Sequence, residues 1–364
     1  MRIRLEKRLT PSRLMLVATP IASVLLTMLL GAIIFELIGF DGPNAIYQTF
    51  ITPVVASYKW EDVFVKAAPL IIIGLGLSLG NEAKVWNIGA EGQYIVGALS
   101  GAGVAMLTTD APAYVAIPLM TLAGILGGAL WGAIPAWLRT SFRVSEVLSS
   151  LMLVYVALQI LSYLIGGPWK DPNGHNFPQT PPLSAAQELP KVIAGTPIPP
   201  GLVVAIVLTL VFWVLSARSV YGFSVRTVGA APSAARYGGF DAKRTIWSTM
   251  IISGGMAGLA GILEVMSQLN QINLGFPSGY GFTGIIVSFL GRLHPVGVFL
   301  AGLILAVTYV GGQVAQTVVH VPQATAGIFQ ATMLFFILAS DIFVRYRVRI
   351  VRDAPRAAVA GASA

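Results

Sequence analysis

The sequence contains no cysteine and little charge. The absence of cysteine excludes disulfide bonds, thiolate catalysis and cysteine-ligated metal sites. Only 10% of the 364 residues are charged, whereas a soluble domain carries about a quarter. Such a chain lacks the polar side chains that a water-soluble fold needs on its surface, while a bilayer requires apolar ones there. The composition therefore predicts an integral membrane protein.

Histidines and catalytic motifs are also scarce. His175, His294 and His320 are far apart in the sequence, which favours structural or solvated roles over metal binding. No G-x-x-x-x-G-K-[ST] segment is present, so this chain does not bind ATP through a P-loop. A His-Glu-x-x-His motif and a nucleophile elbow are missing too. These absences predict a chain that is not an enzyme and binds no metal or cofactor itself.

Long apolar segments and glycine are what the sequence has in abundance. Hydrophobic residues make up 55% of the chain, and its 39 glycines suit the close packing of membrane helices. About 20 residues are needed to cross about 30 Å of hydrocarbon. We predict an all-α membrane protein of about ten transmembrane helices, the eighth being short enough to be broken or re-entrant. The predicted spans lie near residues 14–38, 63–80, 86–107, 113–138, 147–166, 201–217, 246–266, 279–291, 295–313 and 325–344.

The distribution of lysine and arginine predicts the orientation. With the N-terminus in the cytoplasm, 19 of the 23 basic residues fall on the inner side, and only Lys59, Lys66, Lys170 and Lys191 fall outside. The net charge of +8 is then a consequence of topology and not a nucleic-acid surface. We therefore predict that both termini are cytoplasmic. The predicted parts are an N-terminal segment (1–13), a transmembrane region (14–344) and a C-terminal tail (345–364).

Two connecting loops are long. Residues 167–200 form an outer segment with nine prolines, which rule out a regular helix; this loop is either a docking surface or a spacer. Residues 218–245 form the largest inner loop. In it, Pro232 is suited to begin a short helix that runs to Tyr237 and ends at Gly238 and Gly239. Such a helix is either a contact for another subunit or part of a solvated basic loop anchored by lipid phosphate.

Polar residues interrupt the third predicted span. Asn87, Glu91 and Gln93 lie at its start, with Gly89 and Gly92 beside the carboxylate. A charge at membrane depth costs about 2.5–3.5 kcal/mol and so should face a cavity or a partner. The pattern is typical of a discontinuous helix whose freed backbone groups face a substrate. Alternatively, Glu91 stabilises the break structurally, by its place in the positive first turn of the helix that follows.

A second interruption lies in the other half of the chain. Gly279, Gly281 and Gly284 open the short apolar run of the eighth predicted span. Glycine-interrupted segments in corresponding positions of two halves indicate a central transport pathway. Glu264 and Asn270, at the outer end of the seventh span, either bind ligand or are simply hydrated.

Specific motifs in these segments resemble a known family. The stretch 68–98, with its core NIGAEGQ (87–93), resembles the permease subunits of bacterial ABC importers for nucleosides and related simple sugars, within the ribose-permease-like superfamily. The resemblance recurs at 143–157, 168–183, 228–262 and 279–298, and it covers the chain from about residue 60 to 345.

The resemblance implies a type II-like importer permease in the bacterial inner membrane. It implies a second homologous permease in a heterodimer, a cytoplasmic ABC ATPase that uses the ATP, an extracytoplasmic substrate-binding protein, and contact with membrane lipid. It places the contacts with the ATPase at Ala235, Arg236, Tyr237, Gly238 and Asp241. It places the translocation pathway at Asn87, Gly89, Glu91, Gln93, Gly281, Phe282 and Thr283.

Alternatives from other classes remain open at the level of sequence. A stand-alone secondary transporter or channel for a small polar solute would need no partner ATPase, and a membrane-embedded enzyme would need catalytic groups that we do not find. Among importer substrates, nucleosides are favoured over free sugars. However, Thr283 stands where relatives frequently have an acidic residue, which weakens the assignment to nucleosides if that acid contacts the substrate.

Overall fold

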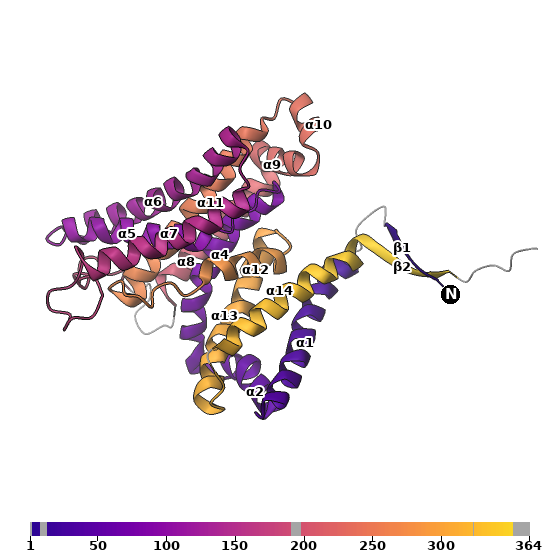
Figure 1. Cartoon of the computed structure of the whole chain (residues 1–364), viewed down its shortest axis with the longest axis horizontal. Helices are drawn as coiled ribbons and strands as arrows, with labels where there is room; N and C mark the ends of the chain where they lie inside the picture. Colours follow the sequence, from indigo (N-terminus) through magenta and orange to yellow (C-terminus); the bar gives the residue numbers. More distant parts are fainter. Residues whose placement is uncertain (1, 8–12, 191–197, 323, 352–364) are drawn as a thin grey trace, which may run out of the picture.

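The computed structural model describes residues 2–7, 13–190, 198–322 and 324–351. Parts of three predicted segments therefore lie outside the described residues: 1 and 8–12 of the N-terminal segment, 191–197 of the outer loop, and 352–364 of the C-terminal tail. Helices make up nearly all of the regular structure (Figure 1). In chain order they are α1 (Arg13–Ile38), α2 (Gly42–Ile46), η1 (Tyr47–Ile51), α3 (Thr52–Val55), η2 (Ser57–Lys59), α4 (Trp60–Glu82), α5 (Ala90–Leu107), α6 (Ala113–Phe142), α7 (Glu146–Gly166), α8 (Pro200–Arg218), α9 (Val220–Ala230), α10 (Pro232–Tyr237), α11 (Ala242–Glu264), η3 (Val265–Leu269), α12 (Tyr280–Leu290), α13 (Pro295–Val318) and α14 (Ala324–Arg345).

Each of the ten predicted spans coincides with one of these helices. Seven helices in the described part of the chain are long and apolar enough to cross a membrane: α1, α4, α6, α7, α8, α11 and α13. The third predicted span begins later than expected, at Ala90, because residues 83–89 form a turn. The eighth is the 11-residue helix α12, as its short apolar run predicted. The structure thus confirms a helical membrane protein and, by length and composition, seven of its spans.

Helices α4, α5 and α11 form the buried centre of the molecule, and α6 packs against α5 and α11 along its outer edge (Figure 1). Glycines let α6 and α11 approach until their backbones touch. A Cβ added to Gly128 would come 2.2 Å from the carbonyl oxygen of Gly254, and one added to Gly258 would come 2.2 Å from that of Gly124. Because small residues are what allow such contact in membranes, the glycine content seen in the sequence is used at this interface.

The first and last helices pack together beside this centre. Phe35 of α1 and Phe329 of α14 have ring centroids 5.3 Å apart. Beyond these helices, β1 (Arg2–Lys7) pairs with β2 (Tyr346–Val351) as a two-stranded antiparallel ribbon, from Arg2 opposite Val351 to Lys7 opposite Tyr346. Figure 1 shows this ribbon projecting from the end of the α1–α14 pair. The ribbon is a departure from the all-α prediction, and it joins the two ends of the chain.

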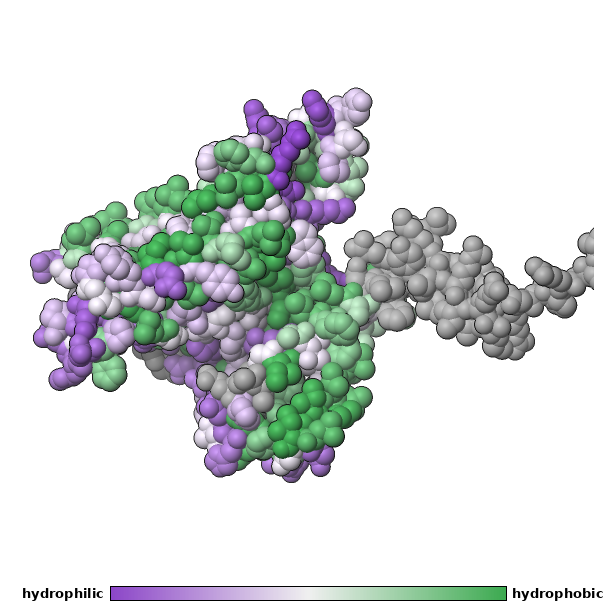
Figure 2. Space-filling model, viewed as in Figure 1, coloured by the Kyte–Doolittle hydropathy of each residue, from purple (hydrophilic) through white to green (hydrophobic). Residues whose placement is uncertain are grey.

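The surface of the molecule is apolar on its flanks. Figure 2 shows hydrophobic residues along the sides, and hydrophilic residues gathered around α10 at the top and at the left-hand end. Bands of exposed apolar side chains between polar ends are what a bilayer requires. On α1 the large hydrophobic side chains that are exposed are Leu14, Ile21, Leu25, Leu26, Leu29, Leu30, Ile33, Leu37 and Ile38.

Candidate functional site

The first interruption is held together by an amide pair. The Asn87 Nδ2 donates to Gln93 Oε1 at 2.7 Å, and the Gln93 Nε2 donates back to Asn87 Oδ1 at 3.1 Å. Asn87 also donates to Ser253 Oγ of α11 at 2.9 Å and accepts from the backbone N–H of Gly89 at 3.1 Å. Both amides are buried, 3% and 1% exposed. These two predicted pathway residues therefore fix the turn between α4 and α5.

The second interruption consists of η3, an irregular segment and the start of α12. Gly279 adopts a positive φ of 77° as the residue before α12, a conformation that suits glycine. Just upstream, the ring of Phe276 stacks on Tyr94 of α5, with centroids 4.7 Å apart and planes 8° from parallel. Tyr280 packs edge-on against Tyr94. Aromatic packing thus places the second interruption directly against the helix that follows the first.

Glu91 joins the two interruptions. It lies in the first turn of α5, and its carboxylate accepts hydrogen bonds from the backbone N–H groups of Gly279, at 2.9 Å, and Gly281, at 2.6 Å. These N–H groups belong to the N-terminus of α12, which has no intrahelical partners for them and favours negative charge. The carboxylate is 2% exposed. Glu91 therefore caps a helix that lies 190 residues further along the chain.

Gly281 is the point of closest contact. A Cβ at this position would come 2.1 Å from the backbone nitrogen of Glu91. The backbones of the two interruptions therefore touch, and only glycine fits at position 281. The structure brings together all seven predicted pathway residues within these two neighbouring segments.

Thr283 and Phe282 occupy opposite environments in the first turn of α12. The Thr283 hydroxyl, 3% exposed, donates to Gln330 Oε1 of α14 at 3.1 Å and lies 3.0 Å from the Tyr309 hydroxyl of α13. The Phe282 ring is 40% exposed. Among the predicted pathway residues with long side chains, Phe282 is the one whose side chain is exposed on the surface of the protein.

A buried ion pair lies beside the aromatic cluster. Lys66 Nζ of α4 is 3.6 Å from Glu264 Oε1 of α11, and the glutamate is only 5% exposed. The same Lys66 ammonium lies 5.5 Å from the centre of the Tyr280 ring, a cation–π distance. Glu264 is therefore paired within the protein and is not a hydrated end-of-helix residue.

The proline-rich loop packs over the end of α5 and over the segment that follows α11. Within its described residues, 167–190 and 198–200, the first of these stretches forms backbone hydrogen bonds with the segment after α11: Thr180 with Ile272, Leu183 with Asn270, and Leu189 with Met266. Its Gln187 side chain, 1% exposed, donates to the carbonyl oxygens of Ala105 and Thr108 at the end of α5. The loop is thus an ordered cover that packs over α5 and η3.

The inner loop contains two short helices. The structure confirms the helix expected from Pro232, since α10 spans Pro232–Tyr237 and ends at Gly238, whereas α9 was not predicted. Of the residues proposed to contact an ATPase, Tyr237 is 96% exposed, and Arg236 and Gly238 are exposed as well. Ala235, in contrast, is fully buried and packs α10 onto the protein.

Asp241 has a structural task in this loop. Its carboxylate accepts from the Lys243 N–H at 2.8 Å and so caps α11. It also lies 3.8 Å from Arg244. Because an N-capping side chain fixes where a helix begins, Asp241 sets the start of α11.

Several residues of the site were not anticipated. Ser253, Tyr309 and Gln330 are polar residues within apolar helices, but single polar side chains of this kind are too common to identify from sequence. The partnership of Lys66 with Glu264 had one usable indication, since each is an ionisable residue inside a predicted span. Within the part of the chain that the structure describes, no cluster of three histidine or acidic residues suited to a metal ion occurs.

Comparisons of the sequence with known proteins give matches over most of the chain. The sequence profile described as "branched-chain amino acid transport system / permease component" matches residues 60–338. A glucose ABC transporter permease protein of Haloferax volcanii is 36% identical over 99% of this chain and 98% of its own length. Two guanosine ABC transporter permease proteins of Bacillus subtilis are also similar. One is 29% identical over 93% of this chain and 96% of its own length, the other 28% identical over 66% and 76%. No solved structure gives a significant match.

Proposed function

The chain belongs to the family of permease components of branched-chain amino acid transport systems, and from this premise we propose that it transports a neutral, hydroxyl-rich solute, a nucleoside or simple sugar. As a member of this family it is a permease subunit of an ABC importer and not an enzyme. It is a multi-pass protein of the inner membrane that works with an ATPase and a substrate-binding protein. The stand-alone carrier considered from the sequence is therefore not supported.

The observation that carries the substrate proposal is similarity over almost the full chain to permeases of glucose and guanosine transporters. Both substrates are uncharged at neutral pH and carry several hydroxyl groups. The match with glucose permease is the stronger in identity, so simple sugars stand beside the nucleosides that the sequence motifs favoured.

The charges of the site agree with a neutral substrate. The Glu91 carboxylate is committed to two backbone N–H groups, and Lys66 and Glu264 are committed to each other. A free amino acid carries an ammonium and a carboxylate, which need opposite charges when they leave water. No such uncommitted charge lies among the predicted pathway residues in the described structure, which argues against branched-chain amino acids as cargo.

The translocation pathway, in this proposal, passes the face of α12 that presents Phe282. The ring of Phe282 supplies a surface on which a sugar or base can slide or stack. Asn87, Gly89, Glu91, Gln93, Gly281 and Thr283 form the rigid support behind this face. We propose that they act on the pathway by positioning α12.

The second permease is proposed to be a different chain. Bacillus subtilis has two distinct guanosine permease proteins that both resemble this one, which is what a heterodimeric pore requires. ATP is consumed by the ATPase, and its closure is transmitted through α10, where Arg236 and Tyr237 are exposed for contact. Both termini and α10 lie on the cytoplasmic side, with the proline-rich loop outside. In this assignment the parts are 1–13, the transmembrane region 14–344 and the tail 345–364.

The test is uptake by the reconstituted complex. Proteoliposomes would contain this permease, the second permease and the ATPase, with the binding protein added outside. Labelled guanosine, glucose and leucine would be supplied separately, with and without internal ATP, and an ATPase with its catalytic glutamate replaced would be the control. We expect ATP-dependent uptake of guanosine or glucose and none of leucine.

The outcomes separate the parts of the proposal. Uptake of leucine would overturn the neutral-substrate assignment. Uptake that continues with the inactive ATPase would contradict the coupling. A Phe282→Ala complex that assembles normally should take up the favoured solute up to about tenfold more slowly, since an aromatic contact contributes about 0.5–1.5 kcal/mol. An unchanged rate would remove Phe282 from the pathway.

A further inference from the structure

Helix α12 is covered by the rest of the chain on every side but one. Of its 11 residues, Phe282, Ile285 and Phe289 are the three that are not buried. Positions i, i+3 and i+7 lie on one face of a helix, so these three residues form a single open face. Phe282 and Phe289 are about 10 Å apart along the axis, at about 1.5 Å per residue. The surface that begins at Phe282 therefore continues to the C-terminal end of α12.

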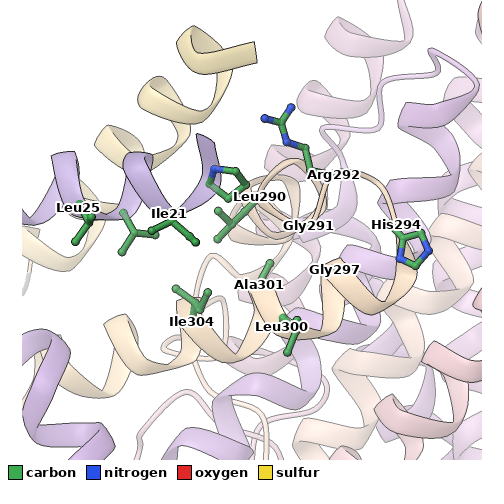
Figure 3. Close-up of a pocket in the computed structure, with 12 residues that line it drawn as sticks. Ile21, Leu25, Leu290, Gly291, Arg292, His294, Gly297, Leu300, Ala301 and Ile304 are labelled. Atoms are coloured by element: carbon green, nitrogen blue, oxygen red, sulfur yellow. The ribbon is translucent and has the colours of Figure 1, made fainter. Parts of the chain in front are cut away.

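A groove beside α12 is a separate feature. Leu290 lines it, together with residues of α1 and α13, and its volume is about 620 Å³. Figure 3 shows Leu290 with Ile21 of α1 and Ile304 of α13 around this space. Because consecutive residues of a helix point about 100° apart, the groove and the open face lie on different sides of α12. Its walls along α1 and α13 are aliphatic, so a flat solute finds aromatic rings to stack on only at the open face.

Trp86 extends the open face at the C-terminal end of α12. Its indole stacks on Phe289, with ring centroids 5.4 Å apart and planes 27° apart. Phe289 engages one side of the indole, and yet Trp86 is still 41% exposed. A second aromatic surface is therefore available about two helical turns from Phe282.

The end of α4 places Trp86 against α12. Lys84, two residues after the end of α4, adopts a positive φ of 56°, a conformation that ends helices and is usually left to glycine. Asn81 Nδ2, in the last turn of α4, donates to Ser288 Oγ of α12 at 3.0 Å. The turn that carries Trp86 is thus tied to α12, and the indole is held in position although much of it is exposed.

The inner loop holds the same turn from another direction. Gly229 of α9 is buried, and a Cβ added to it would overlap the carbonyl oxygen of Glu82, the last residue of α4. The backbones of α9 and α4 therefore touch just before the turn of Trp86. Helix α10 begins at Pro232, three residues after Gly229. A movement of α10 against the ATPase would reach Trp86 through this one backbone contact.

We propose that Trp86 is a second contact for the transported solute, reached after Phe282 on the way to the cytoplasm. This inference rests on the proposed function, since it takes the pathway to follow the open face of α12. The solute is uncharged and has a flat surface, either a nucleobase or one side of a sugar ring, which lies against the exposed part of the indole. Because α9 contacts the end of α4, movement of α10 changes this contact and releases the solute.

Labelling of single cysteines tests the contact, because the chain has no cysteine of its own. The whole complex would be placed in nanodiscs and treated with a charged, water-soluble methanethiosulfonate, and the label on this chain would be measured by its mass. Thiols react as thiolates, which form in water and not in lipid. The variants are Trp86→Cys and, as the matched control, Trp213→Cys on α8, whose tryptophan is 42% exposed.

We expect Trp86→Cys to be labelled and Trp213→Cys not. The solute that the unmodified complex takes up, guanosine or glucose, should slow the labelling of Trp86→Cys when it is supplied with the binding protein. In the uptake assay, Trp86→Ala should slow uptake up to about tenfold, the contribution of one aromatic contact. Trp86→Phe should keep most of the rate, and Trp213→Ala should leave it unchanged.

Three results would overturn the inference while the unmodified complex still transports. One is a Trp86→Cys variant that is not labelled, which would mean that lipid or the second permease covers this position. Another is labelling of Trp86→Cys and Trp213→Cys at the same rate. The last is uptake by Trp86→Ala at the unmodified rate, with labelling that the solute does not slow. Absence of guanosine and glucose uptake by the unmodified complex would instead overturn the proposed function, and this inference with it.

Discussion

At the scale of single residues, the two oxygens of the Glu91 carboxylate are both used. Each accepts one N–H from the start of α12. In Glu91→Gln one acceptor becomes an NH₂ group, so either Gly279 or Gly281 is left with an unpaired buried N–H. This costs about 1–3 kcal/mol.

We therefore expect Glu91→Gln to lower the thermal midpoint of the purified complex and to slow uptake. Asp110→Asn, in an exposed turn, is the matched control and should change stability by less than about 0.5 kcal/mol. If Glu91→Gln were as stable as the control, α12 would not depend on this cap.

The Lys66–Glu264 pair gives a second prediction at this scale. Lys66→Met leaves the buried Glu264 carboxylate without its cation and should cost about 3 kcal/mol. Replacing both residues, as Lys66→Met with Glu264→Leu, should recover most of that loss because no charge remains buried. Stability of the two single variants and the double variant would be measured in one detergent. Additive losses would show that the two groups do not interact.

Part of this residue-level picture was accessible from the sequence. The location of the first interruption followed from Asn87, Gly89 and Glu91, because polar groups and glycines rarely coincide in a span without a reason. The partner of Glu91 did not, because the groups that donate to its carboxylate are backbone N–H groups, which leave no trace in residue identity. The structural role of Glu91 was one of two readings left open, and its contacts favour that one.

At the scale of elements, the α6–α11 contact depends on glycines that face each other. Gly258→Ala would place a methyl group 2.2 Å from a carbonyl oxygen of α6, so the helices must separate. We expect a loss of about 1–3 kcal/mol, typical of overpacking. Gly255→Ala is the control on the same helix, because its added Cβ would meet the nearest atom at 3.4 Å.

The measurement is the fraction of monodisperse protein and its thermal midpoint after extraction. Equal behaviour of the two alanine variants would mean that α6 and α11 are further apart than described.

Helix α10 allows the coupling proposal to be tested apart from folding. Tyr237 is 96% exposed, so Tyr237→Ala should leave stability within about 0.5 kcal/mol of the original. It should nevertheless reduce the stimulation of ATP hydrolysis by substrate and binding protein. Tyr114→Ala, exposed at the start of α6, serves as the control. Normal stimulation in Tyr237→Ala would assign the contact to another element.

The elements that the sequence predicted well are those whose start and end are marked by particular residues. Pro232 and Gly238 bracket α10, and α12 was short because its apolar run is short. Helix α9 was missed because it is neither apolar enough for a span nor marked by proline or glycine at both ends. Ala235 is buried and Tyr237 is exposed because of the face that α10 turns toward the rest of the protein. A six-residue helix is too short for its hydrophobic periodicity to predict that face.

At the scale of the whole molecule, the absence of cysteine makes the orientation directly measurable. Single cysteines at Ser233, on α10, and at Phe177, in the proline-rich loop, are both at exposed positions. In intact cells an impermeant maleimide should label Phe177→Cys at once and Ser233→Cys only after permeabilisation. The reverse pattern would invert the assigned topology, and labelling of both would contradict a separation of these loops by the membrane.

The pairing of α1 with α14, and of β1 with β2, sets an order of events during synthesis. Helix α1 leaves the ribosome long before its partner helix, which is completed just over 300 residues later. At about 5–20 residues per second, α1 waits on the order of 15–60 s with its α14-facing side in lipid. Its long apolar sequence makes that wait tolerable. In a chain truncated before α14, helix α1 would stay without its partner. We expect membrane quality control to recognise such a chain through α1 and not through the helix at the truncated end.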